Sequence, residues 1–304
     1  MMKFYSNSLP VTSFNIGLII TDFLQLTKFR LAISVVFSSL AGYLLAADKI
    51  ETQVLLGLFF GGFSMVGASN AFNQLIEKNK DSLMLRTQNR PLPGGRMSNI
   101  TAFTIATVLT FLGILILQYI NYKTALFGVL SVFLYACIYT PLKSVTSLAV
   151  FVGAFPGAIP FMLGWVAATG SFGIEPGILF MIQFFWQFPH FWAIGWVLHD
   201  QYETAGFKML PSGKPDQITA FQIVFYSLWT VVISLIPAFH YTGQLYLTLP
   251  ATVFVMLLGV FFLYAGIQLM YSKTIKAAQF LIKVSIFYIT GIQLIYVIDK
   301  FLLQ

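Results

Sequence analysis

Long apolar stretches separated by short polar segments make up most of the chain. A membrane-spanning helix needs about 20 apolar residues, whereas barrel strands show roughly ten residues of alternating hydrophobicity. The pattern predicts an all-α polytopic membrane protein that forms a single membrane-embedded domain over residues 1–304. We expect nine transmembrane helices, at about 31–47, 54–76, 100–120, 125–141, 148–168, 177–198, 220–239, 247–270 and 280–298.

Composition agrees with a membrane location. Hydrophobic residues make up 58% of the chain and charged residues only 9%, whereas soluble domains carry about 25% charge; the mean hydropathy is +0.83. The single cysteine, Cys137, rules out an intramolecular disulfide framework and any CxxC metal site. Residues 1–27 lack a compact apolar segment that ends in a small-residue cleavage site, so we expect no cleavable signal peptide.

The basic residues are distributed very unevenly between the two sides of the predicted membrane. Of the 17 lysines and arginines, only Lys49, Lys123 and Lys300 fall on the side reached after the odd-numbered spans. Basic loops stay in the cytoplasm, so we expect a cytoplasmic N-terminal segment (residues 1–28), cytoplasmic loops at 77–98 and 199–217, and a place in the bacterial cytoplasmic membrane. Topology thus explains the net charge of +7, and no nucleic-acid partner is expected.

Three oxygen-bearing side chains stand at the end of the second span, at a helical spacing. Asn73, Glu77 and Asp81 follow one another at intervals of four residues. Such positions drift by only about 40° per step and rise by about 6 Å, so the three side chains would form one stripe on a helix. A second polar loop places Asp200 and Glu203 at the exit of the sixth span.

These residue types suit a divalent cation that carries a phosphate. Mg²⁺ prefers carboxylate and amide oxygens and is usually shared with substrate phosphates, so we assign it to the stripe, with Asp200 and Glu203 as candidates for a second ion. Basic side chains would hold the diphosphate and stabilise it as a leaving group. The candidates are Arg86, Arg90, Lys143 and Lys214. The alternative is that the acids are solvated at the membrane surface or paired with nearby lysines.

The same segment carries a family resemblance. The pattern N-x-x-x-E-x-x-x-D-S-x-M-x-R-T-x-N-R-P-L over residues 73–92 resembles the first aspartate-rich motif of UbiA-type intramembrane prenyltransferases, and its tail is similar to the branch that farnesylates protoheme IX. Blocks of that branch follow in the same order: YTPLK at 139–143, GAIP and GW within 157–165, AATG at 167–170, WQFPHFW at 186–192 and AGFKMLP at 205–211. The resemblance covers about residues 22–211.

The resemblance implies nine helices around a central cavity and a defined reaction. Asn73, Glu77 and Asp81 would bind the magnesium diphosphate of farnesyl diphosphate, with Arg86 and Arg90 clamping the leaving group. Farnesyl would pass to a vinyl carbon of heme B, water would add, and heme O would result. The implied substrate-binding residues are Tyr139, Lys143, Trp186, His190, Tyr202, Lys208 and Lys214. A downstream heme A synthase or a terminal oxidase assembly would then be a partner.

Some positions depart from the family pattern or keep two interpretations. Position 77 is Glu where many relatives have Asp, and Asn79 and Gln201 stand where acids are common, so the second metal site rests on proximity alone. Phe161 replaces a usual proline. His190 is either an axial ligand of heme iron or a histidine hydrogen-bonded to a neighbouring helix.

Two other functions compete with heme farnesylation. One is prenylation of another acceptor, such as a quinone precursor or chlorophyllide. The other is ion-coupled transport, in which acids and glycine-rich spans form a path near the membrane midplane. The acids lie instead at helix ends beside arginines, which favours the prenyltransferase. Arg96 lies outside the matched motif, so we interpret it as a topological charge.

Overall fold

The computed structural model describes residues 16–302, which form helices and loops and contain no strand. Residues 1–15 of the predicted N-terminal segment lie outside the described part. The elements are α1 (Ile16–Leu26), α2 (Phe29–Ala46), α3 (Thr52–Asp81), α4 (Asn99–Ile120), α5 (Tyr122–Phe133), η1 (Leu134–Tyr139), α6 (Thr140–Leu142), α7 (Ala149–Thr169), α8 (Ile174–Val197), α9 (His199–Thr204), α10 (Gln217–Leu235), η2 (Ile236–Phe239), α11 (Leu249–Ser272) and α12 (Ile275–Leu302).

The all-α membrane architecture is confirmed, but the number of crossings is not. Every predicted span coincides with one long helix or with a continuous run such as α5, η1 and α6. Within residues 16–302, eight helices are long and apolar enough to cross a membrane, and α8 is not among them. Three buried polar side chains, Gln183, Gln187 and His190, interrupt its apolar sequence. Nine crossings and a cytoplasmic N-terminus therefore stay predictions.

The helices pack side by side, and α2 and α7 approach each other closely enough for backbone contact. A Cβ atom on Gly42 would lie 2.0 Å from the carbonyl oxygen of Phe161, and one on Gly164 would lie 1.9 Å from that of Ser39. The two backbones can touch only because neither glycine has a side chain. Further contacts join α3 to α4, α7 to α8, and α8 to both α10 and α12.

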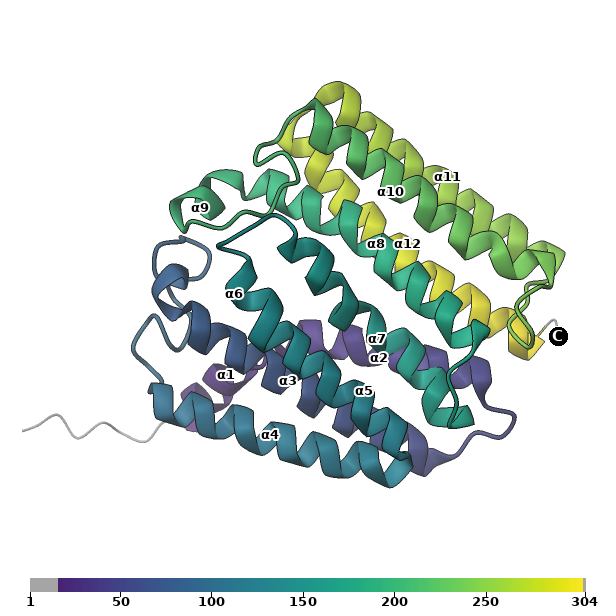
Figure 1. Ribbon diagram of the computed structural model, residues 1–304, viewed down its shortest axis with the longest axis horizontal. Helices are drawn as coiled ribbons and strands as arrows, with labels where there is room; N and C mark the ends of the chain where they lie inside the picture. The colour runs from purple at the N-terminus through teal and green to yellow at the C-terminus, as the bar shows by residue number, and fades with distance from the viewer. Residues whose placement is uncertain (1–15, 303–304) are drawn as a thin grey trace, which may run out of the picture.

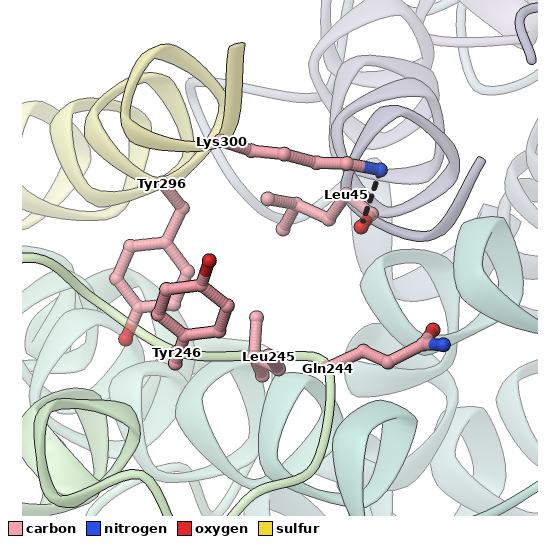
Figure 2. A pocket seen from close by; sticks show the side chains of 6 residues that line it. All are labelled: Leu45, Gln244, Leu245, Tyr246, Tyr296 and Lys300. Atoms are coloured by element: carbon pink, nitrogen blue, oxygen red, sulfur yellow. Dashed lines mark hydrogen bonds between the residues drawn. The ribbon is translucent and has the colours of Figure 1, made fainter. Parts of the chain in front are cut away.

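The last helix contacts the first long one, far from it in sequence. Lys300 on α12 donates hydrogen bonds to the carbonyl oxygens of Leu44, Leu45 and Ala47, at 3.1, 3.0 and 2.8 Å. These carbonyls belong to the end of α2, where a helix leaves its final acceptors without partners. Figure 2 shows Lys300 beside a small pocket that Leu45, Gln244, Leu245, Tyr246 and Tyr296 also line.

The two predicted loops lie together at the other end of the molecule. Figure 1 shows the segment after α3 and the segment around α9 at the left, whereas the end of α12 and the α10–α11 connection lie at the right. Because α2 has 18 residues, the pocket in Figure 2 is separated from the start of α2 by about 27 Å. A second, apolar pocket lies among α2, α3, α4, α5 and α7. The central cavity stays a prediction.

Candidate active site

The stripe of Asn73, Glu77 and Asp81 lies on a buried face of α3. Their side chains are 2%, 5% and 1% exposed. The helix continues five residues past the predicted span and ends at Asp81, and Lys78 and Lys80 in its last turn complement the helix dipole. The hydroxyl of Thr87 then donates a 2.8 Å hydrogen bond to the Asp81 carbonyl. This turn satisfies a terminal acceptor and directs the following chain back over the helix end.

Each member of the stripe contacts a different cation. Lys28 donates to the Asn73 amide oxygen at 3.2 Å. Lys143 pairs with the Glu77 carboxylate, and Arg90 pairs with an Asp81 carboxylate oxygen at 2.7 Å. Two of these contacts, those of Arg90 and Lys143, join residues that the sequence predicted to share a site. Lys28 was missed, because its position before the first span has an adequate explanation in topology alone.

A π-helical turn brings Lys143 to α3. The segment η1 ends at Tyr139, and the backbone N–H and the hydroxyl of Thr140 both donate to the Tyr135 carbonyl. Pro141 has no N–H to continue the α-helical ladder, and π-turns of this kind recur at functional sites. The Thr140 hydroxyl also accepts a 3.2 Å hydrogen bond from the Asn73 amide.

The second loop reaches the site through Phe207. The ammonium of Lys143 lies over the rings of Tyr139 and Phe207, at 5.0 and 5.1 Å from their centroids. The backbone N–H of Lys208 donates a 2.7 Å hydrogen bond to the Lys143 carbonyl, which fixes the loop in place. Burial lowers the pKa of Lys143, and the neighbouring Glu77 carboxylate opposes that shift.

The acids of the second loop are placed differently from the first stripe. Asp200 and Glu203 are exposed on α9, and no ion pair in residues 16–302 joins them to α3. The described residues also hold no group of three or more His, Cys, Asp or Glu side chains arranged for a metal. A second ion at Asp200 and Glu203 stays a prediction.

The loops do contact each other directly. The backbone N–H of Arg86 donates to the Gln201 amide oxygen at 3.3 Å. Gln201, one of the positions that depart from the family pattern, therefore links the two loops. Tyr202 is partly buried beside Phe207, with ring centroids 6.0 Å apart. Burial raises the pKa of Tyr202. The side chains of Arg86, Lys208 and Lys214 are exposed.

Arg96 corrects the sequence interpretation, which gave it a topological role only. Its guanidinium pairs with Asp22 at 2.9 Å and also donates to the Gln25 side chain and the Asn89 carbonyl, at 3.1 and 3.0 Å. It therefore fastens α1 to the loop that carries Arg90. Only the tertiary placement of α1 reveals this.

His190 and Trp186 lie on α8, and their side chains contact α12. The Nδ1 atom of His190 is 2.7 Å from the Ser285 hydroxyl, and Trp186 donates to the Ser285 carbonyl at 2.7 Å. The two rings stack at 4.7 Å. The contact between His190 and Ser285 is the hydrogen bond to a neighbouring helix that one of the two interpretations of His190 predicted. Axial ligation of heme iron by His190 stays a prediction.

The electrostatics of the site favour an anionic ligand. Three cations, Lys28, Arg90 and Lys143, contact the stripe, which contains only two carboxylates, those of Glu77 and Asp81. Burial lowers the pKa of Lys28 to about 7, and the positive charges of Arg90 and Lys143 contribute to the shift. Cations crowded together in this way repel one another, and a bound polyanion would relieve that repulsion.

The donor set also fits a hard divalent cation. One amide oxygen and two carboxylates lie on one face of α3 and are desolvated, and Mg²⁺ takes a small number of such oxygens together with phosphate. Lys143 and Arg90 neutralise the two carboxylates in the structure. These cations could turn to phosphate oxygens once a metal ion takes their place.

Comparison with known proteins agrees with the helical membrane fold. The model of the UbiA prenyltransferase family matches residues 35–288, so the chain belongs to the UbiA prenyltransferase family, a class of membrane-embedded enzymes that transfer prenyl groups. A protoheme IX farnesyltransferase of Flavobacterium psychrophilum is 62% identical over 93% of this chain and 96% of its own length. One of Flavobacterium johnsoniae is 56% identical over 99% of this chain and 100% of its own.

Solved structures show the same fold at low sequence identity. The structure of a digeranylgeranylglyceryl phosphate synthase superposes with a TM-score of 0.76 at 17% identity, covering 92% of this chain and 98% of that one. A UbiA homologue from Archaeoglobus fulgidus, bound to DMAPP and Mg²⁺, gives a TM-score of 0.62 at 13% identity, covering 90% and 99%. At these identities the likeness establishes the architecture alone.

Proposed function

We propose that this enzyme transfers the farnesyl group of farnesyl diphosphate to a vinyl group of heme B, with addition of water, and releases heme O and diphosphate. The observation that carries the proposal is the alternation of oxygen ligands and cations at the end of α3, where Asn73, Glu77 and Asp81 each contact a separate basic side chain. The names of the similar relatives support the choice of donor and acceptor.

In this proposal the stripe and its cations have separate tasks. Asn73, Glu77 and Asp81 would hold Mg²⁺, which when bound neutralises the charge that develops on the departing diphosphate. Arg90 would bind phosphate oxygens through its planar guanidinium, and Lys143 would do so as a point charge. Arg86, Lys208 and Lys214 are exposed nearby on the loops and could close over the diphosphate.

The bond changes balance without a redox step. The allylic C–O bond breaks, and its electron pair leaves with the diphosphate. The vinyl π-electrons of heme B attack the allylic carbon, and water adds to the cationic carbon that results and then loses a proton. The rings of Tyr139 and Tyr202 border the cluster, and aromatic faces stabilise cations. The desolvated site would keep water from the first cation.

We place the site at the cytoplasmic face of the bacterial cytoplasmic membrane. The stripe lies at the end of α3 where basic loops gather, and loops of that kind remain cytoplasmic. Farnesyl diphosphate would enter from that side, with its diphosphate at the cluster and its chain among the helices. The lipid bilayer would surround the exposed apolar side chains of the outer helices, such as Phe111, Leu115 and Phe254.

Incubating the purified protein with Mg²⁺, farnesyl diphosphate and heme B tests the proposal. Diphosphate release together with farnesylated, hydrated heme is the expected result. Farnesylation of a quinone precursor or of chlorophyllide in place of heme would support the alternative acceptor instead. Asp81→Asn should abolish release, whereas Asp48→Asn, an exposed carboxylate at the far end of α2, should not. Equal activity in both variants would contradict the metal assignment.

A further inference from the structure

The short helix α1 ends against the helix that carries the stripe. The Gln74 amide on α3 donates to the carbonyls of Gln25 and Leu26, at 3.0 and 2.8 Å. The Asn70 amide donates to the Thr27 carbonyl at 3.1 Å. The final carbonyls of a helix have no partner within the helix, so two side chains on α3 cap α1 directly beside Asn73.

A second set of contacts holds α1 from the loop after α3. The ion pair of Arg96 with Asp22, and its hydrogen bond to Gln25, both fall on α1. The same guanidinium bonds the carbonyl of Asn89, the neighbour of Arg90. The position of α1 is therefore coupled to the position of a cation that pairs with the stripe.

The chain turns sharply where α1 meets α2, and Lys28 occupies the turn. Its φ angle is +49°, in the left-handed region, which non-glycine residues adopt at a cost of about 1–3 kcal/mol. The capped carbonyls on one side and the start of α2 on the other hold it in this conformation. As a result its ammonium points to the Asn73 amide oxygen.

Lys28 differs from the other two cations in its partner. Arg90 and Lys143 each pair with a carboxylate. Among residues 16–302, Lys28 makes one side-chain hydrogen bond, to a neutral amide, and forms no ion pair. An ammonium has three N–H donors, so the partly buried group retains donors that a ligand could use.

We propose that Lys28 is a further substrate-binding residue, whose ammonium binds a phosphate oxygen of the prenyl diphosphate, and that the clamp of Arg96, Asn70 and Gln74 on α1 sets its position. This inference rests on the proposed function, because it names a partner for the anion at the same site. A purely structural role would be satisfied by any donor to Asn73, whereas substrate binding requires the positive charge.

Kinetics and binding separate these two roles. Lys28→Met should weaken the inhibition by inorganic pyrophosphate with Mg²⁺, and raise KM for farnesyl diphosphate, by roughly 10- to 100-fold, the value of one charge-assisted hydrogen bond. KM for heme should not change, and Lys28→Arg should recover part of the loss. Lys78→Met is the matched control, because Lys78 also donates to an amide oxygen, that of Asn99 at 3.0 Å, away from the stripe.

The clamp is tested by a double-mutant cycle. Arg96→Gln should raise KM for farnesyl diphosphate in the same direction, and its effect should be smaller in the Lys28→Met background, because part of it acts through Lys28. Full additivity would overturn the role of the clamp. Pyrophosphate inhibition and KM unchanged in Lys28→Met, or a loss accompanied by unfolding in both Lys28→Met and Lys28→Arg, would overturn the binding role.

These outcomes are distinguishable from failure of the proposed function. If the wild-type protein farnesylates heme and Lys28→Met does so with the same KM, the inference fails alone. Pyrophosphate could inhibit diphosphate release less in Lys28→Met than in the wild-type protein, while the wild-type protein yields no farnesylated heme. In that case the heme assignment fails and the role of Lys28 stands.

Discussion

The pair of Glu77 and Lys143 gives the sharpest test of how the site is balanced. Glu77→Gln removes a carboxylate that is 6% exposed in its side chain and leaves Lys143, at 11%, without its counter-charge. Removal of one partner from a buried ion pair costs about 3–5 kcal/mol. The rings of Tyr139 and Phe207 under the ammonium offset roughly 1 kcal/mol. We therefore expect a loss of about 2–4 kcal/mol in the free energy of unfolding.

The double variant Glu77→Gln/Lys143→Met should recover most of that stability, because no uncompensated charge remains, yet its activity should stay lost.

Burial already lowers the pKa of Lys143, and without Glu77 the pKa of Lys143 falls further. Above the lowered pKa, Lys143 of the Glu77→Gln variant is neutral in the folded state but still protonated in the unfolded state. The unfolded state therefore binds more protons, and the stability of this variant rises with pH in that range. Unfolding of detergent-solubilised protein at several pH values measures both effects. A double variant as unstable as the sum of the singles would refute this reasoning.

Three further predictions concern packing and metal dependence. Lys300→Met should lower stability by about 1–3 kcal/mol, because three carbonyls at the end of α2 lose their donor; Lys49→Met, exposed near that end, should be neutral in the same thermal assay. Gly42→Ala should sharply reduce the yield of folded protein, because its Cβ would meet backbone at 2.0 Å, whereas Gly177→Ala meets nothing within 4 Å. Chelation by EDTA should stop diphosphate release, and Mg²⁺ should restore it; release that persists would contradict a metal role.

Hydrophobic pattern predicted the fold well because lipid imposes one rule on the whole chain. Every backbone polar group in a membrane must be satisfied within its own segment, so helix length and hydropathy locate the spans. The exception, α8, shows the limit of that rule. Its polar side chains face other helices, as Gln187 does in donating to the Ala154 carbonyl at 2.9 Å, so low hydropathy there reflects the interior of the bundle.

The stripe was predictable, but most of its partners were not. Asn73, Glu77 and Asp81 depend only on helical spacing, which is visible in the sequence. The contact of Lys143 depends on a π-turn, and that of Lys28 on a left-handed turn whose position is set by side chains on α3. These are tertiary effects, with no local pattern to announce them.

The second loop illustrates the same limit. Its charged residues suggested a second acidic cluster, yet the loop enters the site through Phe207 and contacts the first loop through Gln201. A backbone hydrogen bond from Lys208 to Lys143 also joins the loop to the site. Any residue type except proline can donate such a bond, so the side-chain pattern carries no record of it.

Mass spectrometry of the product formed from heme B, farnesyl diphosphate and Mg²⁺ tests the central claim most directly. We predict a heme whose mass has increased by one farnesyl group and one water, formed in equal amount with released diphosphate and absent from the Asp81→Asn variant. Recovery of unmodified heme, with diphosphate released only when a different prenyl acceptor is supplied, would contradict heme farnesylation.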